Sequence, residues 1–409
     1  MASDTLDGSR PKASTPAHSD RLPVAALLAL AMTGFICIVT ETLPAGLLPQ
    51  VGAGLGISQA MAGQLVTAYA LGSLTAAIPL TIATQGWRRR NALLLTIVGF
   101  LLFNSITAVS SNFILTLSAR FFAGASAGLA WSLLGAYARR MVRPDQQGKA
   151  MALAMIGTPL ALSLGVPLGT LMGNTVGWRT AFGIMSALTL LLIVWVLAKV
   201  PDYPGQAGSQ GQPLKKVLST PGVQPVLGVV IAWMLAHNVL YTYIAPFVAQ
   251  AGLDDRVGLV LLTFGVASLA GIGISGRLVD RHLRAAVLTS LLAFVAVALC
   301  FVGLAHLPAA VYAGLAVWGL SFGGAATLLQ TALADAAGDG ADVALSMNVV
   351  AWNSAIAGGG LLGGMLLNTW GAQSFPWALI AFLLLAVLIT HSARKHGFPV
   401  TPRMVPSSI

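Results

Sequence analysis

Twelve long apolar segments, separated by short gaps, occupy almost the whole of this sequence. Each segment is long enough to cross a bilayer, because ~20 predominantly apolar residues in a helix span the hydrocarbon core. We therefore predict an all-α membrane protein with twelve transmembrane helices. The predicted segments are residues 24–50, 58–83, 91–110, 113–138, 150–173, 178–198, 223–250, 257–276, 285–305, 308–333, 343–370 and 375–392.

The positive charges follow this pattern, since 19 of the 22 Lys and Arg residues lie in the two tails or in alternate gaps. The positive-inside rule places such gaps on the cytoplasmic side, so we predict that both termini are cytoplasmic. Arg179 and Arg256 fall on the opposite face, and Arg120 lies within a segment. The gap at 334–342 holds three Asp and no base. Acids count little in the rule, so the predicted topology stands.

Composition agrees with a membrane protein, because 56% apolar and only 8% charged residues do not provide a soluble surface. The net charge of +10 reflects topology, and its spread over several short loops argues against a nucleic-acid partner. Cys37 and Cys300 both lie within apolar segments, so we expect neither a disulfide framework nor a metal site. No cofactor is expected.

The segments divide into two sets of six. Between them lies a stretch rich in Gly, Gln and Pro, which indicates a linker. The first polar residues indicate a disordered tail. Parallel six-helix repeats are typical of one large class of secondary transporters. The predicted division is a cytoplasmic tail at 1–21, an N-terminal half at 22–200, a linker at 201–222, a C-terminal half at 223–393 and a cytoplasmic tail at 394–409.

The two halves echo each other weakly in sequence. The gap after the second segment begins with Gly86 and three Arg, and the corresponding gap of the second half contains Gly276, Asp280 and Arg281. The first segment ends in Glu41-Thr-Leu-Pro, and the seventh ends in Tyr-Thr-Tyr-Ile-Ala-Pro.

Several motifs are similar to those of one known family. They are Thr40–Pro49, Ala62–Ala70, Ala119-Arg120 with Gly124 and Gly128, Gly165-Val166-Pro167-Leu168-Gly169, and Gly177-Trp178-Arg179. At these residues the chain resembles the major facilitator superfamily, within it the proton-coupled drug and sugar efflux branch that includes arabinose-efflux and purine-nucleoside-efflux permeases. The resemblance covers nearly all of residues 24–392 and implies the fold of that family.

The resemblance also implies residues that govern conformational change. Gly165, Pro167 and Gly169 resemble a shortened antiporter motif, and the Gly276–Arg281 gap, with Asp280, resembles the family's Gly-x-x-x-Asp-Arg loop. The gap that starts at Gly86 lacks this Asp, which puts a latching role of that loop in doubt. Glycines spaced by four also favour close helix packing in the fifth and eleventh segments, either as sliding surfaces or as ordinary contacts.

Glu41 is the sharpest single residue, because it is the only glutamate in the chain and lies inside a segment. A carboxylate at membrane depth usually faces a cavity or a partner and marks an ion or proton pathway. The alternative is a carboxylate near the outer helix end that is merely wetted, since Glu41 lies about 13 Å below that end.

Arg120 lies about 10 Å from the outer end of its segment, close to the depth of Glu41. If the first and fourth segments both line the central cavity, as the resemblance implies, the two side chains could pair, with protonation of Glu41 loosening the pair. The alternative is a static ion pair that holds two helices together.

The seventh segment supplies the predicted solute contacts. His237 and Tyr241 share one helix face near mid-membrane, and Asn238 and Tyr243 flank them. Such groups can hydrogen-bond a polar solute while the rings stack on a sugar or base. A histidine bonded to a neighbouring helix is the alternative. Weaker candidates, for which helix packing is the simpler role, are Tyr69, Trp131 and Asn353.

These features together predict a secondary active transporter of a small organic solute (a sugar, nucleoside or drug) that works by alternating access. The resemblance implies that it exports this solute by proton antiport. No phosphate-binding loop and no convergent catalytic set occurs, so we expect neither direct ATP drive nor an enzyme. The predicted partners are a small-molecule substrate, protons and the lipid bilayer, in the cytoplasmic membrane of a bacterium, and a monomer is compatible with the sequence. Proton-coupled uptake and a non-transporting sensor remain alternatives.

Overall fold

The computed structural model describes residues 22–205 and 213–399, and every regular element in these ranges is a helix. Within them, eleven helical stretches are long and apolar enough to cross a membrane. The prediction of an all-α membrane protein is thus confirmed. The predicted tail at 1–21, residues 206–212 of the predicted linker and residues 400–409 lie outside the described residues.

The helices up to residue 199 form an N-terminal group. They follow the first six predicted segments, with small differences at their ends. They are α1 (Val24–Gly46), α2 (Leu48–Leu55), α3 (Gln59–Ala83), α4 (Arg89–Val109), α5 (Phe113–Arg140), η1 (Pro144–Gln146), α6 (Gln147–Met155), α7 (Gly157–Leu160), η2 (Ala161–Gly165), α8 (Val166–Val176) and α9 (Trp178–Lys199).

The helices from residue 223 onward form a C-terminal group, preceded by the short α10 (Leu214–Leu218). They are α11 (Val223–Thr242), α12 (Ile244–Ala249), η3 (Asp254–Arg256), α13 (Val257–Leu304), α14 (Pro308–Gly323), α15 (Ala325–Ala337), η4 (Gly338–Gly340), α16 (Ala341–Trp370), η5 (Ala372–Ser374) and α17 (Phe375–Ser392).

The element α13 contains two helices that meet at a kink, and they carry the predicted segments 257–276 and 285–305. Its 48 residues would extend about 72 Å if straight, more than twice the thickness of the hydrocarbon core. The backbone leaves helical geometry at His282 (φ −133°, ψ 34°), where the helix bends.

The echo between the first and seventh segments corresponds to a shared local structure. Helix α1 gives way to α2 at Leu47, and α11 gives way to α12 at Tyr243. Pro49 and Pro246 follow these breaks closely and cannot donate the backbone hydrogen bond that would continue the helix. Proline placement thus explains why both segments break at matching points.

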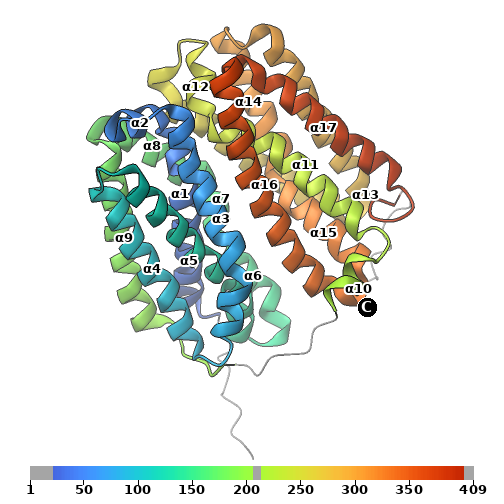
Figure 1. Cartoon of the computed structure of the whole chain (residues 1–409). Helices are drawn as coiled ribbons and strands as arrows, with labels where there is room; N and C mark the ends of the chain where they lie inside the picture. Colours follow the sequence, from blue (N-terminus) through green and yellow to red (C-terminus); the bar gives the residue numbers. More distant parts are fainter. Residues whose placement is uncertain (1–21, 206–212, 400–409) are drawn as a thin grey trace, which may run out of the picture.

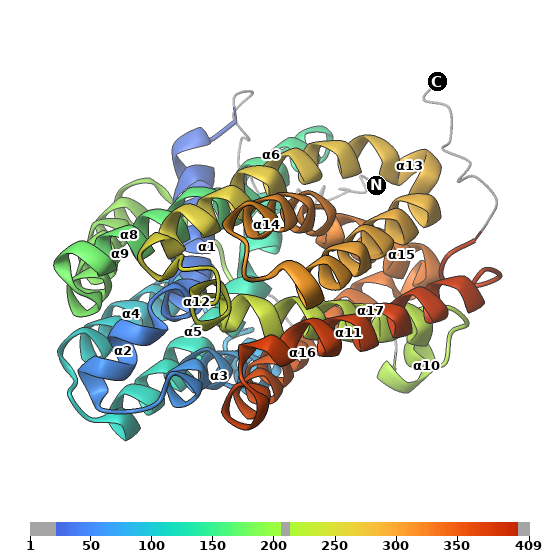
Figure 2. The ribbon, with the colours of Figure 1, turned by 90° about the horizontal axis from the view of Figure 1, so that it is seen from above.

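The two groups of helices lie side by side (Figures 1 and 2). Figure 1 shows their ribbons close together at the end that carries α2 and α12, here called the far end, and diverging toward the end that carries α6 and α10, here called the linker end. Between the groups, α3 packs against α16, and α8 packs against α13.

Candidate functional site

Arg120 of α5 binds backbone carbonyls inside the N-terminal group. Its Nε donates to the Leu65 carbonyl at 3.4 Å, and its Nη2 donates to the Glu41 carbonyl at 3.2 Å. Its guanidinium carbon lies 4.9 Å from the centroid of the Tyr69 ring and 5.6 Å from that of Phe182. Carbonyl oxygens and aromatic faces are favourable neighbours for a buried cation. They hold Arg120 in one orientation between α1, α3 and α9.

One guanidinium nitrogen of Arg120 takes no part in these hydrogen bonds. Nη1 is buried and has no hydrogen-bond partner in the described part of the chain. A buried charged donor without a partner is costly, so an arrangement that supplies an acceptor is favoured. The nearest acidic candidate is the carboxylate of Glu41, whose charge interacts with Arg120.

Glu41 is almost enclosed, with 8% of its surface exposed. Among the described residues, no hydrogen bond or ion pair reaches its carboxylate, although its carbonyl is bonded to Arg120. The predicted proximity of Glu41 and Arg120 is therefore present, but the two side chains do not form an ion pair here.

His237 lies in a cluster of aromatic rings in the C-terminal group. Its ring stacks on Phe322 at 3.7 Å between centroids with an interplanar angle of 1°, and on Tyr241 at 5.1 Å. Trp318 and Phe264 complete the cluster at 5.2 and 5.8 Å from His237. The five rings, here called the aromatic cluster, come from α11, α13 and α14.

Polar atoms of the aromatic cluster lack partners. His237 Nδ1 and Trp318 Nε1 are buried and make no hydrogen bond in the described residues, whereas the Tyr241 hydroxyl has Thr42 within reach. Such groups in native proteins usually have partners, so each one calls for an explanation such as a bound molecule. Apolar walls with a few convergent polar groups are typical of small-molecule sites.

The aromatic cluster adjoins Glu41 across the boundary between the two groups. The hydroxyl of Tyr241 lies beside Thr42, and Tyr241 interacts electrostatically with Glu41. Helices α1 and α11 are in contact, which brings these residues together. The structure thus joins an acid and a base of the N-terminal group to an aromatic surface of the C-terminal group.

Other predicted solute contacts bond within the protein. The amide nitrogen of Asn238 donates to the Met234 carbonyl at 2.8 Å, and that of Asn353 donates to the Val349 carbonyl at 3.0 Å. Both bonds stay within one helix, so a role of these amides in solute contact stays a prediction.

Tyr69 and Trp131 face the interior of the N-terminal group. The hydroxyl of Tyr69 donates to the Cys37 carbonyl at 2.9 Å while its ring supports Arg120. Trp131 is half-buried and lies against Gly34 of α1. Neither contact decides between packing and solute binding, and both residues stay predictions.

Tyr243 joins the two groups at the far end. Its hydroxyl lies 2.8 Å from the Gly360 carbonyl oxygen and 3.2 Å from that of Ala60, and it accepts a hydrogen bond from Gln64 Nε2 at 3.1 Å. A Cβ atom at Gly63 would overlap the Tyr243 ring, so glycine is required for this approach. These contacts favour a role in closing the far end.

Three residues assigned to conformational change, Gly165, Pro167 and Gly169, face different groups of helices. Gly165 and Gly169 face Phe35, Val39 and Leu43 of α1, within the same group. The Pro167 carbonyl instead lies against Gly258 of α13, in the other group. Just before Pro167 the chain forms a π-helical turn at Ala161–Gly165, and such turns are frequent at functional sites.

Gly276, Asp280 and Arg281 are exposed on α13 just before its bend at His282. Their predicted latching role is neither supported nor opposed by this position. Among the described residues, no group of three His, Cys, Asp or Glu side chains gathers as metal ligands.

Sequence reasoning missed Phe264, Trp318, Phe322 and Gln64. Trp318 and Phe322 are spaced by four, like His237 and Tyr241, and this spacing was the one available signal. Aromatic residues at helical spacing inside an apolar segment look the same as ordinary core residues, so the signal alone is weak.

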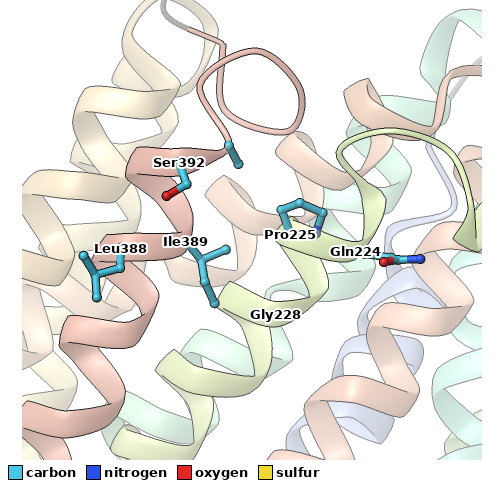
Figure 3. A pocket seen from close by; sticks show the side chains of 7 residues that line it. Gln224, Pro225, Gly228, Leu388, Ile389 and Ser392 are labelled. Carbon is cyan, nitrogen blue, oxygen red and sulfur yellow. The ribbon is translucent and has the colours of Figure 1, made fainter.

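A separate hollow of about 550 Å³ lies between the linker ends of α11 and α17 (Figure 3). Its position along α11, at Pro225, is about 18 Å from His237. It is therefore distinct from the aromatic cluster. Its lining residues are Gln224, Pro225, Gly228, Leu388, Ile389, Ser392 and Ala393.

Known proteins are similar to this chain in sequence and in fold. The chain is 30% identical over 370 residues to the purine ribonucleoside efflux pump NepI of Salmonella enteritidis, with 89% of this chain and 92% of that protein covered. It is also 30% identical over 359 residues to the protein of the same name from Shigella sonnei, covering 86% and 90%.

A solved structure has the same fold. A bacterial homologue of the human lysosomal transporter Spinster aligns with a TM-score of 0.68 at 12% identity, covering 93% of this chain and 97% of that one. A sequence model of the Major Facilitator Superfamily matches residues 30–360. The chain therefore belongs to the Major Facilitator Superfamily, and it is a multi-pass membrane transporter and not an enzyme.

Proposed function

We propose that this protein exports a nucleoside-like solute across the bacterial cytoplasmic membrane in exchange for protons. The observation that carries the proposal is the unpaired Glu41 carboxylate beside both Arg120 and the aromatic cluster. The names of the relatives, purine ribonucleoside efflux pumps, support both the solute class and the direction of transport.

The proposed topology has twelve spans, with α13 counted as two that meet at the His282 bend. Both termini then lie in the cytoplasm, as the distribution of Lys and Arg indicates. The two groups correspond to six-helix halves, residues 22–200 and 223–393, joined by a linker at 201–222. The working unit is a monomer.

Proton coupling is assigned to Glu41 and Arg120. When Glu41 is protonated, its neutral carboxyl tolerates the enclosed position seen here, and Arg120 holds only backbone carbonyls. When Glu41 loses the proton, its carboxylate gains a charge-assisted partner in the unused Nη1 of Arg120. Exchange between these two arrangements reshapes α1 beside Tyr241 and so links protonation to solute binding.

Solute binding is assigned to the aromatic cluster. A flat heterocyclic base stacks favourably on the rings of Tyr241 and Phe322, and it offers both donors and acceptors to the unpartnered groups of His237 and Trp318. A solute held there also meets the N-terminal group at Thr42. It therefore contacts both halves at once.

Alternating access requires the two groups to move against each other. Glycines line two of the contacts between them: Gly360 lies against Thr67 where α16 meets α3, and Gly265 lies against Ser163 where α13 meets η2. Small residues let helices approach and slide at close range. Rocking about these contacts alternates opening between the far end and the linker end.

The test uses purified protein in liposomes loaded with a pH-sensitive dye. With an imposed proton gradient, adenosine, inosine and guanosine are each added and proton movement is recorded together with flux of the labelled nucleoside. We expect nucleoside-dependent proton movement in the wild type and its loss in Glu41→Gln. Asp255→Asn, which neutralises an exposed acid next to α13, serves as the control and should behave like the wild type.

Three results would contradict parts of the proposal. Coupled proton movement that persists in Glu41→Gln would remove Glu41 from the mechanism. Nucleoside flux that runs in the direction of the proton gradient would show uptake instead of export. No flux of any nucleoside, with flux of a sugar or drug from the same panel, would refute the proposed solute class.

A further inference from the structure

The five residues that follow α9 lie across the linker end of the N-terminal group. This segment, Pro201–Gly205, is here called the strap. The carbonyl of Tyr203 accepts a hydrogen bond from the Arg89 N–H at 2.8 Å, and the Asp202 carboxylate accepts one from the Arg90 N–H at 3.2 Å. The other Asp202 oxygen forms an ion pair with Arg88.

These bonds satisfy the first turn of α4. The opening N–H groups of a helix have no partner within the helix, and a side chain at the N-cap usually supplies one. Here the N-cap residue is Arg88, whose side chain makes no capping bond. Asp202 supplies the cap from 112 residues away, and its negative charge also suits the positive end of the helix dipole.

Further contacts hold the rest of the strap. The Tyr137 hydroxyl donates to the Pro201 carbonyl at 2.7 Å, and Arg140 donates to the Pro204 carbonyl at 3.0 Å. The Tyr137 and Tyr203 rings meet edge to face at 5.9 Å. The strap is therefore bound to α4 and α5 along its length.

Comparison of the two halves shows what Asp202 replaces. Four residues after Gly276 the chain has Asp280, whereas four residues after Gly86 it has Arg90. The Arg90 backbone N–H is one of the groups that bind Asp202. The acid missing from the first loop is thus supplied at the same place by the chain that leads into the linker.

The linker is also anchored to the C-terminal group. Val217 of α10 is buried, and it packs against Gly340 just before α16. The chain between the groups is therefore fixed at both ends. If the strap were released, the five residues 201–205 would add about 17 Å of reach to that connection.

We propose that Asp202 is a pin that shortens the connection between the two halves and so limits how far they separate at the linker end. The pin acts on the conformational equilibrium and not on the solute or the proton site. This role of Asp202 does not depend on whether the transported solute is a nucleoside.

The experiment measures a distance between the halves in full-length protein. Cys37 and Cys300 are replaced by Ala, and spin labels are placed at Trp87→Cys and Arg277→Cys, which are exposed in the 86–90 gap and on α13. Distance distributions are recorded in liposomes with and without Asp202→Ala. We expect the variant to raise the population of long distances by roughly two- to tenfold, the range expected for loss of one helix cap.

Two further variants keep the proposal open to refutation if Asp202→Ala folds poorly. Asp202→Asn keeps an acceptor for the Arg90 N–H but loses the charge, and Arg88→Gln breaks the ion pair from the other side. Each should give a smaller shift than Asp202→Ala, and the two together should add little, because they remove the same interaction. The control Asp255→Asn should match the wild type. Unchanged distances in Asp202→Ala, or fully additive effects of the pair, would overturn the proposal.

Discussion

The guanidinium of Arg120 donates to the backbone carbonyl of Glu41, at 3.2 Å, and not to its carboxylate. A pair bonded in this way keeps the two helices together whatever the charge of Glu41. The side chain of Glu41 then remains available for a proton, while Arg120 keeps one unused donor within the same site. Structural support and proton exchange are thus carried by different atoms of the same two residues.

Arg120→Gln should damage both functions. The carbonyls of Leu65 and Glu41 would lose charged donors, each worth about 1.5–3 kcal/mol when buried. We expect a lower melting temperature in detergent and proton-coupled flux below about a tenth of the wild-type rate. Arg120→Lys keeps the charge, so it should recover much of the stability but little of the flux. Normal flux in Arg120→Gln would contradict the assignment of Arg120 to coupling.

Trp318→Phe should weaken solute binding selectively. The substitution keeps a ring beside His237 but removes the unpartnered indole N–H. Loss of one hydrogen bond to the solute should raise the KM about five- to tenfold with little change in maximal rate. Trp377→Phe, at an exposed position on α17, is the matched control. An unchanged KM in Trp318→Phe would show that the indole does not reach the solute.

Tyr243→Phe should loosen the far end. The hydroxyl bonds to the carbonyls of Gly360 and Ala60 and accepts a hydrogen bond from Gln64. Ala60 and Gln64 belong to the N-terminal group, so these two bonds connect the groups. Its removal should destabilise this closed arrangement by about 1–2 kcal/mol. Labelling by a membrane-impermeant reagent of a cysteine introduced at Thr67, which is buried against Gly360, should become faster. Labelling at the wild-type rate would indicate that other contacts close the far end.

The strap predicts a dependence of stability on pH. Partial burial favours the neutral acid, but the hydrogen bonds from Arg88 and Arg90 and their charges outweigh it and hold the pKa of Asp202 below its ordinary value of 3.8. A folded-state pKa below the unfolded one adds stability that is fully present above the unfolded pKa and is lost as pH falls through the folded pKa. The stability difference between wild type and Asp202→Asn should therefore be constant from pH 5 to 8 and shrink below about pH 4. A difference that grows on acidification would contradict this sign.

Gly157→Ala should be costly, because a Cβ atom there would overlap the carbonyl oxygen of Ala31 in α1. A backbone atom cannot move aside cheaply, so we expect about 1–3 kcal/mol of destabilisation. Gly183→Ala, in α9, is the comparison, since no atom lies within 4 Å of its Cβ position. Equal melting temperatures of the two variants would show that α7 can retreat from α1.

Much of the helical framework was predictable from sequence, for a physical reason. The bilayer demands helices of a minimum length, and apolar runs therefore mark them well. The depth estimate that placed Glu41 and Arg120 at one level was also sound, because helix rise is constant and Arg120 does reach the Glu41 carbonyl. The predicted gap between segments 257–276 and 285–305 coincides with the kink at His282, where the two helices of α13 meet.

The details of the site were less predictable. Apolar segments carry no mark that separates Trp318 and Phe322, which surround His237, from rings that only fill space. Likewise, nothing local in the sequence links Asp202 to Arg90, because their contact depends on where α9 ends relative to the start of α4. Contacts between distant segments arise from packing in three dimensions, which periodicity does not encode.

The very short junction between the two helices of α13 has a mechanical consequence. The helices meet directly at the kink at His282, with no further chain between them. One helix rests on η2 and α8 of the opposite group, and the other packs within its own group against α17. A displacement of the first helix against the N-terminal group therefore reaches the second helix with no flexible loop between them to absorb it.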